Sequence, residues 1–520
     1  MKTKIKFISA VAIMLVLMLM ITACDSTDLS DTTGNSEPTT EAVQSGDMSE
    51  PDTDSNATTI EPTKKSTFIR YEQHLMTVST DDGIAFFSND TLLRNTADGD
   101  YAAYEQSSLD GTVMAFTTDK NTLYVADGKK LTKVDDNVYQ FDFELSVSGS
   151  GLVYVTTEDD ETQRLHYYNV GSGKQIELDE GADHYDAAIA PNGQTLAYIA
   201  REDSTFSLVF FDGEHSRKLA STETSLFGIS DDGSCIYTAN GYDVYCYDSE
   251  GNRQKVGTLD EDTDIKFNAD HTQLMFNCDG KTYISDKGQE CDKISNDNLY
   301  LIVPPNSNVC RHYNFTTYPV KDLYDHVYLS NDSEVWLISR DSDESIKLIS
   351  KASNVKLDAS AEYLYYIYDS EELRCAKISD GDRASQTCKV IVDDYVFDYV
   401  VTSDGNLVYY LDGDTLYSVN GETGGTRTRI ADDVDSGYLA ISSEDVVCYI
   451  SEGDAYVYME GKTPSRVRRD TVYLVSSPNG YIYAKADDGS YYLPVQEKIA
   501  QDEREYEAYQ ELVDMKDCAY

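Results

Sequence analysis

The sequence predicts an all-β protein: repeated four-stranded sheets that form a β-propeller, followed by one α-helix at the C-terminus. Three observations lead to this prediction. A short polar turn recurs, with its first copies 40, 42 and 40 residues apart. Short runs of β-branched and aromatic residues follow each turn. Tyr occurs 41 times against 15 Phe and one Trp, and Tyr suits strands that bury one face and wet the other.

The chain begins with the features of a secretion signal. Lys2, Lys4 and Lys6 precede an uncharged apolar run from residue 7 to residue 23. A basic start and a short apolar core are typical of signal peptides. A membrane-spanning helix needs about 20 apolar residues, so the run is marginal as a permanent span. We therefore expect residues 1–23 to be a cleaved signal peptide.

The residues that end the apolar run are Ile21, Thr22, Ala23 and Cys24. This stretch resembles the lipobox of bacterial lipoproteins. The resemblance implies that the Cys24 thiol receives a diacylglyceryl group and that cleavage makes Cys24 the new N-terminus. Two acyl chains anchor a protein firmly where one is marginal, which implies a protein held at the extracytoplasmic face of the cell membrane. The alternative is a simple cleaved signal with Cys24 as an ordinary thiol.

The segment after Cys24 has the composition of a tether. Residues 25–67 contain no aromatic residue and are mostly Ser, Thr, Asp, Glu, Gly, Asn and Pro. Such a segment cannot bury enough apolar surface to offset its ordering entropy. We expect residues 24–67 to be a disordered, lipid-anchored tether that lifts the folded part away from the membrane.

The charge of the chain excludes one class of partner. The formal net charge is −51, whereas nucleic acids and anionic lipid surfaces require a basic face. We therefore expect no nucleic-acid partner. The charge indicates a well-solvated surface, with a preference for cations or basic partners as the alternative.

The recurring turn divides the middle of the chain into units of about forty residues. Three apolar runs follow each turn and one precedes it, with Asp-Gly and Asn-Gly pairs at the hairpins, as expected for a four-stranded meander. One such sheet cannot bury both faces, but sheets stacked around an axis can. Copies of the turn begin at Ser108, Ser148, Ala190, Ser230, Asn268, Asp358, Thr402, Ser442 and Ser477.

These units resemble the repeats of the TolB-type propeller family, in which a Ser-Pro-Asp-Gly-like turn precedes a buried strand. Residues 190–193 and 477–480 match that turn best, and the resemblance spans residues 70–495. It implies a WD-like propeller over residues 68–496. We count nine or ten units, and common propellers have about four to eight blades. We therefore expect one ring of about eight blades, closed by pairing of strands near Phe86 and Tyr483, with two smaller rings as the alternative.

Two segments depart from the repeat. Residues 292–320 break the rhythm and place aromatic and basic residues in one loop, which we interpret as a candidate recognition loop or, alternatively, as a connection within an irregular blade. Residues 497–520 have apolar positions at helical spacing, so we expect one amphipathic helix that packs on the ring or docks a partner. The candidate recognition residues are Arg311, His312, Tyr313, Phe315 and Tyr318.

The chain has ten cysteines, and with Cys24 lipidated an odd number remains. Cys235 and Cys246 are equidistant from an Asn-Gly turn, and Cys375 and Cys388 flank Asp-Gly in much the same way. Each pair is a candidate disulfide across a hairpin, and the alternative is a pair of small buried side chains. No CxxC motif occurs, which argues against a zinc ribbon or a thioredoxin-like site.

Motifs that carry chemistry are missing from the sequence. There is no Gly-x-Ser-x-Gly nucleophile elbow, and the seven histidines show no metal-binding spacing. We therefore expect no cofactor and no catalysis. The favoured hypothesis is a non-catalytic binding or scaffold protein of the cell envelope, which binds a protein, peptide or glycan on one propeller face. The alternatives are a lyase or glycosidase that uses acidic residues at the channel mouth, and an accessory sensory or assembly subunit of a membrane complex.

Overall fold

The computed structural model describes residues 68–80, 83–158, 161–181, 184–202, 205–221, 224–260, 263–312, 315–340, 345–502 and 504. All of the described residues belong to one compact unit, which lies within Ile60–Tyr520. The predicted signal peptide, Cys24 and the tether lie outside the described residues. None of the described helices is long and apolar enough to cross a membrane.

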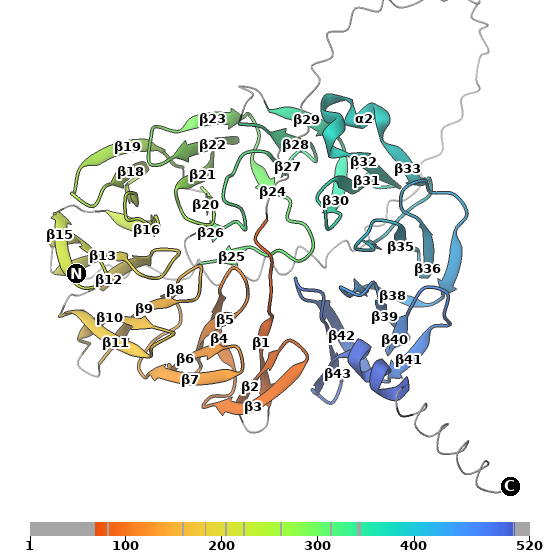
Figure 1. Ribbon diagram of the computed structural model, residues 1–520, viewed down its shortest axis with the longest axis horizontal. Coiled ribbons are helices and arrows are strands. Elements are labelled where there is room, and N and C mark those ends of the chain that lie inside the picture. The colour runs from red at the N-terminus through yellow and green to blue at the C-terminus, as the bar shows by residue number, and fades with distance from the viewer. Residues whose placement is uncertain are drawn as a thin grey trace, which may run out of the picture. The chain divides into compact units, whose positions relative to one another are not determined.

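The described residues form eleven β-sheets, which we number as blades in chain order (Figure 1). Blade 1 comprises β1 (Leu75–Thr80), β2 (Gly83–Ser88) and β3 (Thr91–Ala97), and blade 2 comprises β4 (Ala102–Ser107), β5 (Val113–Thr118), β6 (Leu123–Asp127) and β7 (Lys130–Asp135). Blade 3 comprises β8 (Phe143–Leu145), β9 (Gly151–Thr157), β10 (Gln163–Asn169) and β11 (Lys174–Glu180), and blade 4 comprises β12 (His184–Ile189), β13 (Leu196–Glu202), β14 (Thr205–Phe211) and β15 (Ser216–Ala220).

Blades 5 to 7 follow the same order, and blade 6 gains two strands from a segment inserted into blade 7. Blade 5 comprises β16 (Ser225–Ile229), β17 (Ile236–Asn240), β18 (Asp243–Tyr247) and β19 (Arg253–Thr258). Blade 6 comprises β20 (Ile265–Phe267), β21 (Gln273–Cys278), β22 (Lys281–Asp286) and β23 (Asp292–Ser295), with the added strands β25 (Cys310–Arg311) and β26 (Thr316–Thr317). Blade 7 comprises β24 (Leu299–Leu301), β27 (His326–Ser330), β28 (Val335–Ile338) and β29 (Ile346–Ile349).

Blades 8 to 11 complete the set, and blade 8 contains a short helical insertion. Blade 8 comprises β30 (Ala352–Leu357), β31 (Tyr363–Tyr368), β32 (Glu372–Lys377), η1 (Ile378–Arg383), α2 (Ala384–Thr387) and β33 (Lys389–Val392). Blade 9 comprises β34 (Tyr399–Val401), β35 (Leu407–Asp412), β36 (Thr415–Asn420) and β37 (Thr428–Ala431). Blade 10 comprises β38 (Val434–Ile441), β39 (Val447–Ser451), β40 (Asp454–Tyr458) and β41 (Ser465–Arg468), and blade 11 comprises β42 (Thr471–Ser476), β43 (Ile482–Ala486) and β44 (Tyr491–Tyr492).

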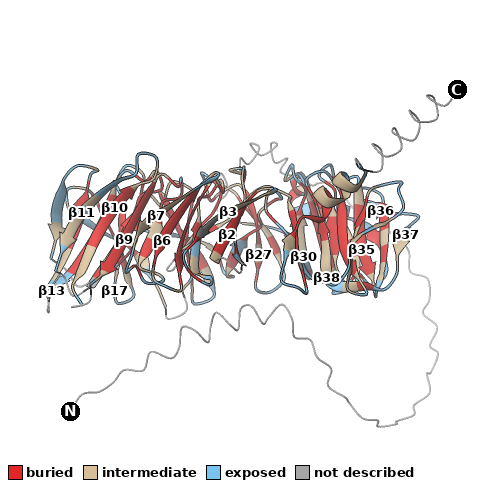
Figure 2. Cartoon of the chain, turned by 90° about the horizontal axis from the view of Figure 1, so that it is seen from below, coloured by how far each residue is buried: buried red, intermediate tan, exposed pale blue. Residues whose placement is uncertain are grey.

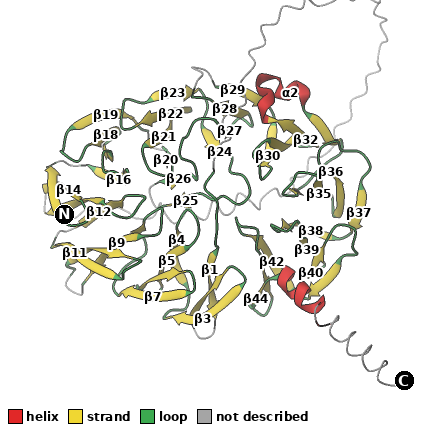
Figure 3. Ribbon diagram, viewed as in Figure 1, coloured by secondary structure: helices red, strands yellow, loops and turns green. Residues whose placement is uncertain are grey.

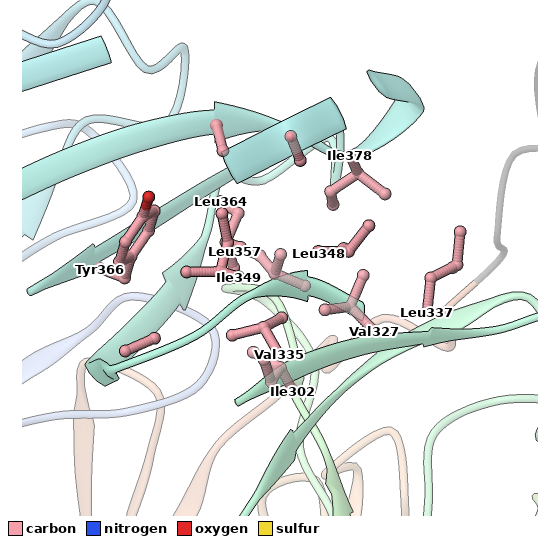
Figure 4. Close-up of a cluster of buried hydrophobic side chains, with 13 residues drawn as sticks. Ile302, Val327, Val335, Leu337, Leu348, Ile349, Leu357, Leu364, Tyr366 and Ile378 are labelled. Atoms are coloured by element: carbon pink, nitrogen blue, oxygen red, sulfur yellow. The ribbon is translucent and has the colours of Figure 1, made fainter. Parts of the chain in front are cut away.

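The sheets pack face to face and close into one ring. Eleven hydrophobic clusters each combine side chains of two neighbouring blades, and together they join every consecutive pair. The cluster between blades 7 and 8, which includes Val335 and Leu364, is drawn in Figure 4. The closing cluster joins Phe87 of blade 1 to Tyr483 and Leu493 of blade 11. The fold is therefore a β-propeller of eleven blades.

The predicted count of about eight blades was wrong, and so was the alternative of two smaller rings. Nine sheets contain a four-stranded meander, as predicted, but blades 1 and 11 have three strands each. The strands near Phe86 and Tyr483 do not share a sheet. They belong to separate blades that contact each other through buried side chains. Because closure uses packing and not strand pairing, the terminal units stay distinct and the count rises.

The recurring turn joins the first two strands in nine blades. Where its first residue has a side-chain oxygen, as in every such turn but the one at Ala190, that oxygen accepts a hydrogen bond from the strand that follows. Ser108 Oγ accepts from Val113 N at 3.0 Å, and Asn268 Oδ1 from Gln273 N at 2.9 Å. The fourth residue has positive φ, which favours Gly. In blade 3 the turn begins at Ser146, two residues before the predicted position.

Antiparallel connectivity gives the ring two different faces. In blades 2 to 11 the hairpins between first and second strands, where they occur, lie on one face, which we call the turn face. The hairpins between second and third strands, and the links from one blade to the next, lie on the other, which we call the connection face. Figure 2 shows burial along the strands and exposure in the loops at their ends.

Helical structure is confined to two described places (Figure 3). One is the insertion of η1 and α2 in blade 8. The other covers residues 494–502 and 504, three residues before the predicted start at 497. Val495 of this helix is buried in the cluster between blades 10 and 11, whereas Ile499 is exposed. The rest of the predicted C-terminal helix lies outside the described residues.

Candidate functional site

The segment between β24 and β27 crosses the middle of the ring, where it replaces the short turn of blade 7 (Figure 1). Its strand β26 pairs in parallel with β20, the first strand of blade 6. Asn306 N donates to Pro478 O of blade 11 at 2.8 Å, and Tyr71 N donates to Asn306 O at 2.7 Å. The segment therefore ties together parts of the ring that are far apart in the sequence.

The predicted recognition residues lie within this segment, and two of the four that the structure describes are buried. Phe315 and Tyr318 are buried, and Phe315 stacks on His312 with ring centroids 4.2 Å apart. Arg311 is exposed, and Tyr313 lies outside the described residues. Because Phe315 and Tyr318 fill the ring, they hold the fold together and cannot contact a partner directly. This corrects the interpretation of these two residues as surface recognition residues.

Acidic side chains of the kind that the catalytic alternative requires occur on first strands. Glu144 lies on β8 and Asp186 on β12, and burial raises their pKa values to about 8 and about 6. Glu144 Oε1 accepts the backbone N–H of Ile189 at 3.1 Å, and Asp186 Oδ2 accepts that of Leu226 at 2.8 Å. Each carboxyl group thus links its blade to the next, which is a structural role.

The pKa of Glu144 predicts a pH dependence of stability. Because this pKa is higher in the folded state than in the unfolded state, the contribution of Glu144 is complete below about pH 4.5 and is lost as the pH rises through about 8. Glu144→Gln keeps an oxygen acceptor, as Gln106 does for Leu145 N at 2.7 Å in the preceding blade. We expect thermal unfolding of Glu144→Gln to vary less between pH 5 and 8 than that of the wild type. An unchanged pH profile would contradict this role.

The two predicted disulfide pairs are placed differently. Cys235 and Cys246 are both buried between blades 5 and 6, and a Cβ added to Gly288 would touch both sulfur atoms. In the second pair, Cys375 is opposite Lys389 and is buried between blades 8 and 9, while Cys388 packs on the opposite side, between blades 7 and 8. The predicted hairpin between them is η1 and α2. This placement favours the first pair and not the second.

We therefore predict a disulfide between Cys235 and Cys246 in protein that has been exposed to oxidant. A hydrogen bond from the Cys246 thiol lowers the pKa of Cys235, and the thiolate is the form that reacts. Thiol labelling under denaturing conditions should find two more reactive cysteines after reduction than before. Cys235→Ser/Cys246→Ser should abolish this difference, and Cys375→Ser/Cys388→Ser should preserve it. Equal labelling before and after reduction would contradict the pairing.

A cavity of about 570 Å³ lies between blades 5 and 6, at the connection face. Asp260, Cys278 and Asp279 line it, with ligand atoms within 4.8 Å of one another. Burial and then the carboxylates of Asp260 and Asp279 raise the pKa of the Cys278 thiol. Thiolate and carboxylate are donors that zinc accepts. Because acids are abundant on this face and Asp279 is exposed, the cluster alone does not identify a metal centre.

Exposed apolar side chains concentrate on the connection face. Among the described residues ten large hydrophobic side chains are exposed, and eight of them lie in blade-to-blade links, in a hairpin between second and third strands, or near the start of a first strand on this face. These eight are Tyr101, Tyr139, Tyr242, Tyr300, Tyr395, Phe397, Val472 and Tyr473. Most of these residues are aromatic, and aromatic residues are enriched in protein interfaces, so this face is the candidate binding surface.

Two of these side chains lie close together in the sequence at the junction of blades 8 and 9. Tyr395 and Phe397 are 50% and 48% exposed in the link between β33 and β34. Val396 N donates to Glu371 O at 3.2 Å, and Phe397 N donates to Leu411 O at 2.9 Å. These bonds hold the link against the hairpins of blades 8 and 9, so its two exposed rings sit on a fixed backbone.

Comparison with known proteins assigns no family to this chain. No protein-family model and no curated protein matches it. Solved structures with a similar arrangement include the tricorn protease (13% identity, TM-score 0.26), PorZ of Porphyromonas gingivalis (11%, 0.31) and TolB of Acinetobacter baumannii (12%, 0.28). The alignments cover 74%, 81% and 52% of this chain and 46%, 63% and 77% of those chains. The chain thus spans less than half of the tricorn protease chain.

Proposed function

We propose that this protein is a lipid-anchored, non-catalytic propeller of the cell envelope that binds a protein partner on its connection face. The observation that carries the proposal is the concentration of exposed aromatic side chains on that face. Tyr and Phe supply large contact areas at low cost in side-chain entropy, and aromatic residues are enriched in protein interfaces. The turn face lacks a comparable set among the described residues.

The position of the protein in the cell rests on the sequence. The basic start, the apolar run and the residues around Cys24 support export and lipid attachment, and residues 25–67 have the composition of a tether. Cys24→Ala should move the protein from the membrane fraction to the soluble or secreted fraction. Retention of Cys24→Ala in the membrane fraction at the wild-type level would overturn the anchoring proposal.

Site-specific photo-crosslinking tests the binding face. A photoreactive benzoylphenylalanine replaces Phe397 or Tyr139 on the connection face, or Asn406 in the turn of blade 9 as a control on the turn face. All three positions are exposed, so none should disturb folding. In native membranes we expect a discrete adduct from the first two positions and none from Asn406. Adducts from Asn406 alone, or from no position, would overturn the proposal.

A further inference from the structure

A recurring combination of three side chains occurs in blades 6 to 11: an aromatic ring, a cation above it and a carboxylate that pairs with the same cation. Arg427 lies 4.4 Å from the ring centroid of Tyr417 and 3.0 Å from an oxygen of Asp412. Of the twelve cation–π contacts among the described residues, eight have this third member. The combination joins cation–π attraction to ion pairing.

Four of these combinations flank blade 8: two lie between blades 8 and 9, and two, which share Tyr368, lie between blades 7 and 8. Their cations are Arg374, Lys351, Lys356 and Arg427. Arg374, for example, lies 3.7 Å from the ring centroid of Tyr368 and 2.6 Å from Glu372. These four cations are therefore already engaged by rings and carboxylates of their own.

The junction itself contains rings and carboxylates without a cation. Among the residues that the structure describes, no cation lies over the ring of Tyr395 or Phe397. Within the same residues, Glu371, Asp393 and Asp414 form no ion pair. All five side chains are exposed. We call these five residues the junction patch. It offers two members of the recurring combination and lacks the cation among the described residues.

We infer that the junction patch binds Arg or Lys side chains of a basic protein segment. The exposed rings supply the cation–π component, and the three carboxylates supply ion pairs. The net charge of −51 attracts a basic partner at long range and speeds association at low salt. This inference rests on the proposed binding function and specifies the chemistry of the partner.

Binding of a fluorescent hexa-arginine peptide to the soluble propeller, with hexa-glutamate as the comparison peptide, tests the inference by fluorescence anisotropy. We expect saturable binding of hexa-arginine that weakens as salt is added, and none of hexa-glutamate. Tyr395→Ala/Phe397→Ala should raise the Kd about fivefold. Glu371→Gln/Asp393→Asn/Asp414→Asn should raise it about tenfold at low salt. Unchanged thermal unfolding of each variant confirms that it is folded.

Matched controls separate the patch from a general effect of charge. Glu444→Gln removes an exposed carboxylate on the turn face, and Asp369→Asn removes one that already pairs with Lys351 at 2.9 Å. Neither should raise the Kd more than about twofold. Failure of hexa-arginine to bind, or an equal effect of controls and patch variants, would overturn the inference. If benzoylphenylalanine at position 397 crosslinks to a partner but hexa-arginine does not bind, the proposed binding function is still supported. Only the inference that the partner segment is basic is then wrong.

Discussion

Replacement of Gly193 by Ala is expected to destabilise the propeller by about 3 kcal/mol. Gly193 is the fourth residue of the turn in blade 4 and has φ of +71°. A Cβ there would lie 2.6 Å from the backbone nitrogen of Gly151 and closer still to Ser150 Oγ, both in the neighbouring blade 3. The added methyl group therefore strains the turn and forces two blades apart.

Gly241→Ala is the matched control for this prediction. Gly241 also has positive φ, +59°, but a Cβ at this position would meet nothing within 4 Å. We expect a loss of about 1 kcal/mol from backbone strain alone. The midpoint of thermal unfolding, measured for both variants, decides the matter. If the Gly193→Ala variant is no less stable than the Gly241→Ala variant, the claim that the turn of blade 4 packs closely against blade 3 is contradicted.

Phe315→Ala is expected to destabilise the protein by about 3–4 kcal/mol. Phe315 is buried, and its ring lies edge-on to Phe267 of blade 6 with centroids 5.4 Å apart. It also belongs to the cluster between blades 5 and 6. Removal of the ring leaves a cavity where the segment between β24 and β27 meets the wall of the propeller, so the segment loses one of its apolar anchors.

Phe397→Ala is the control, because Phe397 is about half exposed and lies on the connection face. Its effect on unfolding should stay within about 0.5 kcal/mol, although it should weaken partner binding. Equal unfolding midpoints for the two variants would contradict the structural role of Phe315 and restore the segment as a surface recognition loop.

The repeat could be predicted because its turn depends on few atoms. In eight of the nine turns the first residue contributes a side-chain oxygen, so Asn268 and Asp358 replace Ser without loss of the hydrogen bond, and Ala190 forms the turn through backbone bonds alone. The fourth residue needs positive φ, which His271 and Ala361 also adopt. The register in blade 3 was harder to predict, since residues 146–151 offer three Ser and two Gly at neighbouring positions.

The number of blades was not predictable from the repeat alone. Blade 7 has no such turn between its first two strands, because the inserted segment takes its place, and blades 1 and 11 differ from the others in strand number. Pairing of Cys375 with Cys388 was wrongly suggested by Asp380-Gly381, which lies in η1 and not in a hairpin. Local sequence patterns specify a hairpin well but say little about which sheets exist and how many close the ring.

The candidate binding surface was also hidden in the sequence. Tyr395 and Phe397 follow the same kind of apolar run as many buried aromatic residues, and only the topology shows that they lie in a link between blades. Similarly, the pattern of residues 310–318 resembles an exposed aromatic loop, whereas pairing of β26 with β20 brings Phe315 and Tyr318 into the ring. Exposure depends on contacts between distant segments, which no local pattern contains.

Both faces, the central segment and the junction patch take their positions from the closed ring of eleven blades. Electron cryomicroscopy of the isolated propeller, viewed along the ring axis, tests this arrangement most directly. We expect eleven radial densities in one ring, with density across its middle from the segment between β24 and β27. A ring of about eight densities, or two separate smaller rings, would contradict the account.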